Sequence, residues 1–210
     1  MSNLPLLPLH TVLLPGNSLS LKIFEPRYVD MIAKCMREDS IFGVVQIYSG
    51  EEIGVNNEIH SIGTTARISD WQNRSDGLLG IIAIGAQRFE IISTNTQKDG
   101  LCIADIKILE EEPFDSVPEQ YLYMQELLNH INQQEGKQSA TESSFGEVLY
   151  RLTYLLPLEN NLKQRLLEIP NSFDRAVILH AELIRLGVIQ YINPDTESDG
   201  PPKPEKNKGH

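Results

Sequence analysis

Two cysteines and several serines are the side chains of this sequence that could act as nucleophiles. Cys35 and Cys102 lie in the apolar segments MIAKCM and LCIAD, with no CxxC motif and no histidine at metal-ligand spacing. A catalytic serine or cysteine needs a neighbouring base and an orienting group, and no G-x-S-x-G motif marks such an arrangement. We therefore predict two buried, reduced thiols and no enzymatic activity.

Histidines and carboxylates could bind a metal ion or transfer protons, but their spacing here favours neither role. No H-E-x-x-H motif occurs, and the five histidines are isolated from one another: His10, His60, His130, His180 and His210. The 29 Asp and Glu residues contain no pair that the sequence singles out. Neither a G-x-x-x-x-G-K-[ST] loop nor G-x-G-x-x-G spacing is present. We predict no metal and no cofactor.

The net charge and the apolar runs indicate which partners and which cellular locations to expect. A formal net charge of −11 without a basic stripe argues against nucleic acid, because phosphate binding needs clustered Lys and Arg. The opening MSNLPLLPLH has no basic n-region and is interrupted by Pro5 and Pro8, so we predict no signal peptide. No run approaches the roughly 18 apolar residues of a membrane span. These features predict a cytoplasmic protein that does not enter a membrane.

The elements that must position any site change in type along the chain. Runs rich in Val, Ile, Thr and Phe alternate with Gly, Asn and Asp clusters, which predicts strands at 19–24, 41–47, 59–71, 78–84, 88–93 and 101–109. Turns are expected between them, including one at Gly85-Ala86. Six strands at this spacing are typical of a small, mostly antiparallel barrel or sandwich.

Helical periodicity marks the remaining elements. Pro26 can occupy the first turn of a helix whose apolar face is spaced at i, i+3, i+4, i+7 and i+8: Tyr28, Met31, Ile32, Cys35 and Met36. After residue 112 the period changes to about 3.6, and four further helices are expected. Ser144 and Glu147 have capping-box spacing, and Gly187 suits a helix C-terminus.

The change of period predicts three segments. Residues 1–112 should form a β-barrel subdomain with one helix, and residues 113–193 a helical bundle. Residues 194–210 are rich in Pro, Asp, Glu and Lys, which predicts a disordered tail. The helical half could also present a face for weak self-association, although a buried core would give the same pattern.

Several motifs together resemble the N-terminal substrate-binding domain of the Lon protease family. The first half contains Pro15-Gly16 followed by L-K-I-F-E-P-R-Y, residues 21–28, and then G-T-T-A-R-I, residues 63–68. Asp76-Gly77 and the G-A-Q-R-F segment, residues 85–89, complete the likeness. The resemblance implies an α+β fold, a PUA-like, mostly antiparallel β pseudo-barrel followed by an α-helical bundle. It also implies binding of unfolded or degradation-marked polypeptides, in a stand-alone form without ATPase or peptidase parts, beside a separate protease or chaperone.

Two interpretations of the motif residues stay open. In the first they border a peptide groove, with Trp71 as a further contact, so the candidates for peptide binding are Phe24, Arg27, Tyr28, Trp71, Arg88 and Phe89. In the second they are structural: Glu25 or another acid pairs with Arg88, and Trp71 caps the barrel mouth. Three other functions are weighed: RNA association, because PUA-like barrels elsewhere bind RNA; small-ligand binding, by likeness to part of cereblon; and a carboxylate hydrolase.

Overall fold

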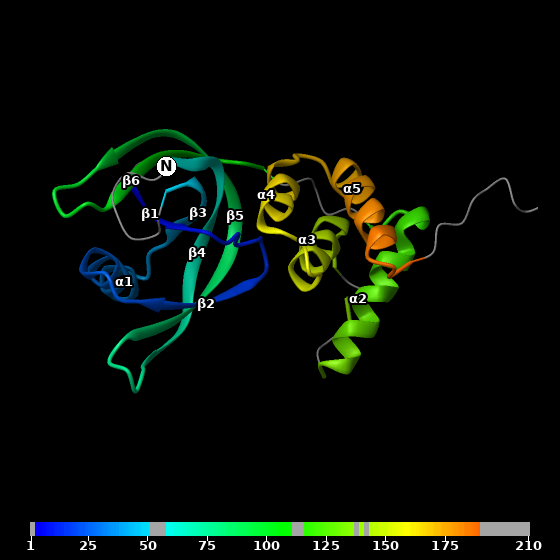
Figure 1. The fold of residues 1–210 in the computed structure, drawn as a ribbon, viewed down its shortest axis with the longest axis horizontal. Coiled ribbons are helices and arrows are strands. Elements are labelled where there is room, and N and C mark those ends of the chain that lie inside the picture. The colour runs from blue at the N-terminus through cyan, green and yellow to red at the C-terminus, as the bar shows by residue number, and fades with distance from the viewer. Residues whose placement is uncertain (1–2, 51–57, 111–115, 137–138, 141–142, 190–210) are drawn as a thin grey trace, which may run out of the picture.

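The first half of the chain folds into one closed β-structure. The computed structural model describes residues 3–50, 58–110, 116–136, 139–140 and 143–189. Six strands occur among them: β1 (Leu4–Leu9), β2 (Ser18–Ile23), β3 (Phe42–Ser49), β4 (Glu58–Asn73), β5 (Leu79–Thr96) and β6 (Cys102–Ile108). Their order is β2-β5-β4-β3-β1-β6, and β5 also pairs with β6. This pairing closes five strands into a ring, with β2 attached to the first part of β5 (Figure 1).

The α+β architecture and the mostly antiparallel pairing confirm the predicted fold class. Only β1 and β3 run parallel among the described strands. The helix α1 (Pro26–Glu38) begins at the predicted proline and buries Tyr28, Met31, Ile32 and Cys35. These side chains pack against Leu7, Phe42, Ile81 and others in one apolar cluster, so α1 is part of the barrel core.

The predicted turn at Gly85-Ala86 is wrong, because β5 continues through it and replaces two predicted strands. Gly85 exchanges backbone hydrogen bonds with the β1–β2 connection: its N–H donates to Asn17 O at 2.9 Å, and its carbonyl accepts from Gly16 N at 3.0 Å. A Cβ at residue 85 would lie 2.5 Å from Leu14 O. The glycine therefore permits a close backbone approach within a strand.

The strand β1 was not predicted, because Pro5 and Pro8 interrupt its sequence. It pairs with β3 over Leu6 to Leu9, but with β6 only at Leu4 and Pro5. Among the described strands, most of β1 therefore has no partner on its second side, where a residue without an N–H is tolerated. Leu4, Leu6 and Leu7 are at most 2% exposed, so the strand is held by burial of its apolar side chains.

The second half of the described chain is helical, as predicted. It contains a short 3-10 turn η1 (Glu119–Tyr121) and the helices α2 (Leu122–Gln134), α3 (Phe145–Leu155), α4 (Asn160–Glu168) and α5 (Ser172–Arg185). The capping box is confirmed: Glu147 N–H donates to Ser144 Oγ at 3.3 Å, and Ser144 N–H donates to Glu147 Oε2 at 2.8 Å. Gly187, with φ of 70°, follows the end of α5. The helices share one apolar core.

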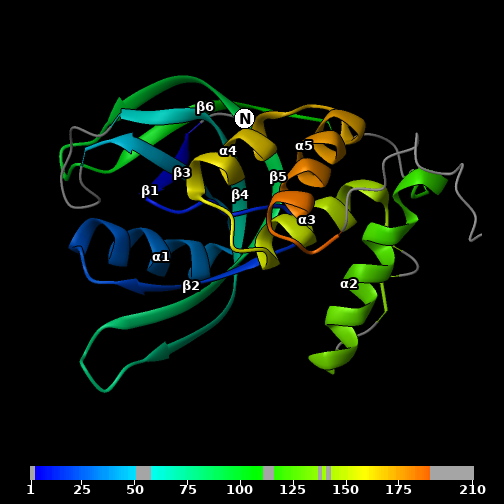
Figure 2. The same cartoon turned by 45° about the vertical axis from the view of Figure 1, so that its right-hand side comes forward.

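The two halves meet at α4, which lies beside the barrel in both views (Figures 1 and 2). Gln164 Nε2 donates to Ile62 O at 3.0 Å, and His60 Nδ1 lies 2.9 Å from Glu168 Oε1. A small apolar cluster of Val12, Leu14, Tyr150 and Leu167 also joins them. The predicted boundary near residue 112 and the predicted tail lie outside the described residues.

Candidate functional site

The E-P-R-Y residues bind one another and the β5–β6 turn. Arg27 Nη2 lies 2.7 Å from Glu25 Oε2, and its Nη1 donates to Gly100 O at 2.8 Å. The guanidinium carbon lies 4.6 Å from the centre of the Tyr28 ring. Arg27 and Tyr28 are 8% and 7% exposed. They fasten the start of α1 to the barrel, and the predicted pair of Glu25 with Arg88 is wrong because Glu25 pairs with Arg27.

Arg88 and Phe89 lie in the interior, which favours the structural interpretation of these residues over the one in which they border a peptide groove. Arg88 is 2% exposed and Phe89 is fully buried. The Nη1 atom of Arg88 donates to Leu167 O at 3.0 Å and to Ile169 O at 3.1 Å, at the C-terminal end of α4. A cation is favourable there, because the last carbonyls of a helix carry partial negative charge. Arg88 therefore joins barrel to helices.

The close packing around Phe89 explains the glycine of the G-T-T-A-R-I segment. A Cβ at Gly63 would lie 2.7 Å from Phe89 Cζ and 2.5 Å from Val44 O. A Cβ at Gly43, on the neighbouring strand, would lie 2.8 Å from the same Phe89 atom. The absence of a side chain at both glycines thus leaves room for the Phe89 ring in the barrel. The glycine of this motif is therefore explained by core packing.

Phe24 and Trp71 are the two predicted contact residues that the structure leaves accessible. Their exposed fractions are 52% and 50%. Trp71, at the end of the predicted strand 59–71, lies on β4, opposite Ile81 of β5. The end of the β4–β5 hairpin extends past β2 and α1 (Figure 2). A half-exposed aromatic ring is suited to contact another molecule.

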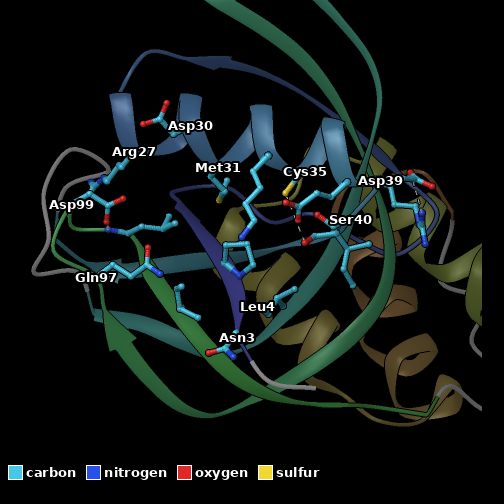
Figure 3. Close-up of a pocket in the computed structure, with 17 residues that line it drawn as sticks. Asn3, Leu4, Arg27, Asp30, Met31, Cys35, Asp39, Ser40, Gln97 and Asp99 are labelled. Carbon is cyan, nitrogen blue, oxygen red and sulfur yellow. Dashed lines mark hydrogen bonds and ion pairs between the residues drawn. The ribbon is translucent and has the colours of Figure 1, made fainter.

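A cavity of about 590 Å³ opens between α1, the start of β1 and the β5–β6 turn. Figure 3 shows Arg27, Gln97 and Asp99 at one end and Asp39 and Ser40 at the other. Leu4, Met31, Cys35 and other apolar side chains line the space between them. Pockets that bind ligands combine such an apolar lining with a few polar groups, in volumes of roughly 300–1,000 Å³. This cavity is the candidate binding site.

Of the residues that line this cavity, only Arg27 was predicted from the sequence as a binding residue. Asn3, Asp39, Gln97 and Asp99 belong to separate segments that carry no motif. Asp39 has φ of 46° at the end of α1, and Asp99 accepts a hydrogen bond from Leu101 N at 3.0 Å within a turn. Their polar, turn-forming side chains predict loops, and a shared pocket follows only from folding.

The two cysteines differ in how deeply they are buried. Both cysteines are free; Cys35 is buried, while Cys102 is only half-buried, so the prediction was too strong for Cys102. Burial raises the pKa of the Cys35 thiol, which disfavours the reactive thiolate. Among the described residues, no three His, Cys, Asp or Glu side chains gather as a metal site would require. None of the described helices is both long and apolar enough to span a bilayer.

The sequence matches the family described as the ATP-dependent protease La (LON) substrate-binding domain, over residues 3–185. The chain belongs to this family. The match is to the substrate-binding domain of Lon, not to its peptidase domain. The predicted relationship to the Lon N-terminal domain, and its association with proteolysis, are thereby confirmed.

Two relatives each align with about half of this chain. Cereblon from Xenopus tropicalis is 36% identical over 112 residues, which span 51% of this chain and 24% of cereblon. The Lon protease of Flavobacterium johnsoniae is 33% identical over 113 residues, which span 53% of this chain and 14% of the protease. The chain thus matches a quarter or less of the length of these relatives.

Solved Lon N-terminal domains have the same fold. The Lon N-terminal domain protein from Xanthomonas campestris superposes with a TM-score of 0.74 at 29% identity, covering 86% of this chain and 98% of that one. The N-terminal domain of the Mycobacterium avium complex Lon protease superposes with a TM-score of 0.63 at 15% identity, covering 90% and 100%. The second likeness concerns the fold alone.

Proposed function

We propose that this chain is a non-catalytic, cytoplasmic module that recognises unfolded or degradation-marked polypeptides. The observation that carries the proposal is the cavity beside α1, which has an apolar floor and polar ends. The chain belongs to the Lon substrate-binding family, so a site for polypeptides is expected in it. Unfolded polypeptides offer apolar side chains and unpaired backbone groups, and such a cavity can accept both. A separate protease or chaperone would then act on the captured chain.

The burial of the motif residues supports this placement of the site. Tyr28, Arg88 and Phe89 are at most 7% exposed, so a polypeptide on the surface cannot reach them in the folded state. Phe24 and Trp71 remain accessible. The cavity and these two aromatic rings are therefore the surface on which recognition is proposed.

Binding of a permanently unfolded protein tests the proposal. Fluorescently labelled, reduced and carboxymethylated α-lactalbumin should bind saturably, with an affinity that resists added salt, while native α-lactalbumin should not. Single-stranded RNA measured in parallel distinguishes the RNA-associated alternative, because phosphate contacts weaken steeply with salt. Salt-sensitive RNA binding without binding of the unfolded protein would overturn the proposal.

A substitution at the cavity mouth locates the binding site. Gln97 lines the cavity and is exposed, so Gln97→Trp should fill its mouth and weaken binding. Thr96 is exposed, neighbours Gln97 and does not line the cavity, so Thr96→Trp is the matched control. Equal affinities of the two variants would contradict the proposed location.

Small-ligand binding is a second candidate, favoured by the size of the same cavity. Its volume of about 590 Å³ lies within the range of small-molecule sites. A screen of small metabolites by thermal shift would identify such a ligand, because binding to the folded state raises Tm. A ligand that displaces the unfolded protein would show that both use one site.

A further inference from the structure

A second cavity continues the first around the C-terminal end of α1. It has a volume of about 320 Å³ and lies between the end of α1 and the segment of β4 that carries Ile68, Asp70 and Trp71. Four residues line both cavities: Cys35, Asp39, Ser40 and Arg67. The two cavities therefore adjoin at these four residues, and together they are here called the α1 groove, with Trp71 at one end.

One wall of the α1 groove is a strand edge that no described strand covers. The strand β3 pairs with β4 only as far as Ala66, whereas β5 pairs with β4 up to Asn73. The N–H of Trp71 donates to Asp70 Oδ1 at 2.8 Å. An open edge of this kind fits an extended polypeptide, whose own backbone can run alongside it.

The charges of the α1 groove favour a cationic occupant. Its described lining contains five carboxylates against three cations; the carboxylates are Asp30, Glu38, Asp39, Asp70 and Asp99, and the cations are Arg27, Lys34 and Arg67. Arg27 is already paired with Glu25, a carboxylate outside the lining. Arg67 lies 3.5 Å from Asp39 with both side chains largely exposed, so that pair is weak. The lining retains an excess of negative charge.

Trp71 supplies an aromatic surface at the acidic end. The ring is 50% exposed, and Asp39 and Asp70 line the same cavity. Tryptophan is the aromatic side chain that attracts a cation most strongly through its ring face. A Lys or Arg side chain can therefore contact the ring while carboxylates balance its charge.

We infer that the α1 groove selects extended polypeptide segments in which Lys or Arg stands beside apolar residues. The cation contacts Trp71 near Asp39 and Asp70, and the apolar neighbours enter the larger cavity beside α1. The inference rests on the proposed function and specifies which polypeptides the module prefers. The net charge of −11 would also favour the approach of basic segments.

The fluorescence of Trp71 reports directly on this site, because it is the one tryptophan in the sequence. Three unstructured peptides of equal length, without Trp or Tyr, are titrated into the full chain: Lys with Leu, Glu in place of Lys, and Ser in place of Leu. The Lys-Leu peptide should shift the Trp71 emission saturably. The Glu peptide should bind about tenfold more weakly or worse, and the Ser peptide should also lose affinity.

Charge-neutral variants test the role of the carboxylates. Asp39→Asn with Asp70→Asn keeps the side-chain shapes, and the new amide oxygen at position 70 can still accept from Trp71 N–H. This double variant should bind the Lys-Leu peptide about tenfold more weakly. Glu119→Gln with Glu126→Gln removes the same charge at positions outside the groove and should leave affinity unchanged.

The outcomes separate the inference from the proposed function. Equal affinity for the Lys and Glu peptides, or binding without a change in Trp71 emission, would overturn the inference and leave polypeptide recognition intact. No binding of any peptide or of unfolded α-lactalbumin would overturn both. Trp71 emission that changes with protein concentration alone would place a second copy of the chain in the groove, and would also overturn the inference.

Discussion

The contact between barrel and helices and the α1 groove place similar side chains in opposite surroundings. At the contact, Arg88 is 2% exposed and donates to two carbonyls at the end of α4. Arg175 donates to Leu166 O and Ile169 O at the same helix end, 3.0 and 2.8 Å away. In the groove, the charged groups of Arg67 and Asp39 lie 3.5 Å apart and both side chains are exposed.

The difference separates residues that build the domain from residues that can bind. Buried arginines at the contact satisfy carbonyls that water cannot reach, so their loss leaves unpaired polar groups. Substitution of an exposed charged residue in the groove should lower the free energy of unfolding only slightly, because water solvates the partner that remains. The family motifs thus mark the stable frame, whereas the accessible groove consists mostly of residues outside those motifs.

Arg88→Leu should give the largest loss of stability. The substitution leaves Leu167 O without its side-chain donor, while Ile169 O still accepts from Arg175 Nη2. A buried unsatisfied group costs about 1–3 kcal/mol, so the free energy of unfolding should fall by about 3 kcal/mol. Urea unfolding followed by circular dichroism measures it. Arg67→Leu is the control and should change stability by less than about 0.5 kcal/mol. Similar losses in both variants would remove the distinction.

Gly85→Ala should have the next largest effect. The new Cβ would lie 2.5 Å from the backbone carbonyl of Leu14, and such overpacking typically costs about 1–3 kcal/mol. Gly80→Ala on the same strand is the control, because its nearest atoms are flexible side-chain atoms of Arg74 and Gln72, at 3.3 and 3.4 Å. Thermal unfolding of the two variants compares them. An unchanged Tm for Gly85→Ala would contradict the close approach.

Tyr123, a partly buried residue of α2 in the helical half, should make the stability depend on pH. Burial, with a smaller contribution from Tyr121, raises its pKa to about 12, above the value of about 10 for an unfolded chain. Folding therefore favours the protonated phenol, and this stabilisation is present below about pH 10 and is lost as the pH rises towards 12. Tm should fall more steeply between about pH 10 and 12 in the wild type than in Tyr123→Phe. Parallel slopes would be the contrary result.

Trp71→Ala should have the smallest effect on stability. Its ring is 50% exposed, so the free energy of unfolding should change by less than about 1 kcal/mol, while binding of a labelled Lys-Leu peptide is lost. Ile92→Ala, on an exposed side chain of β5 that does not line the groove, is the control for binding. A stability loss as large as that of Arg88→Leu would instead support Trp71 as a cap of the barrel mouth.

Local patterns in the sequence predicted much of the secondary structure. The apolar face of α1, the Pro26 start, the capping box at Ser144 and the helical second half all depend on neighbours within a few residues. Two local rules gave the wrong answer in the barrel. The strand β1 was not predicted because it contains two prolines, and Gly85 indicated a turn where β5 continues. In both places strand pairing and close packing outweigh the local preference of the residue.

The motif likeness identified the family but not which of the motif residues are accessible. Arg88 and Phe89 have recognisable spacing, yet nothing local reveals that their side chains enter the interior. Asp39, Asp70, Gln97 and Asp99 belong to different segments and meet around α1 only when the barrel closes. The sequence by itself determined the helices, most of the strands and the family, because these depend on short-range patterns. The tertiary structure alone decided which side chains are buried, because burial depends on long-range pairing.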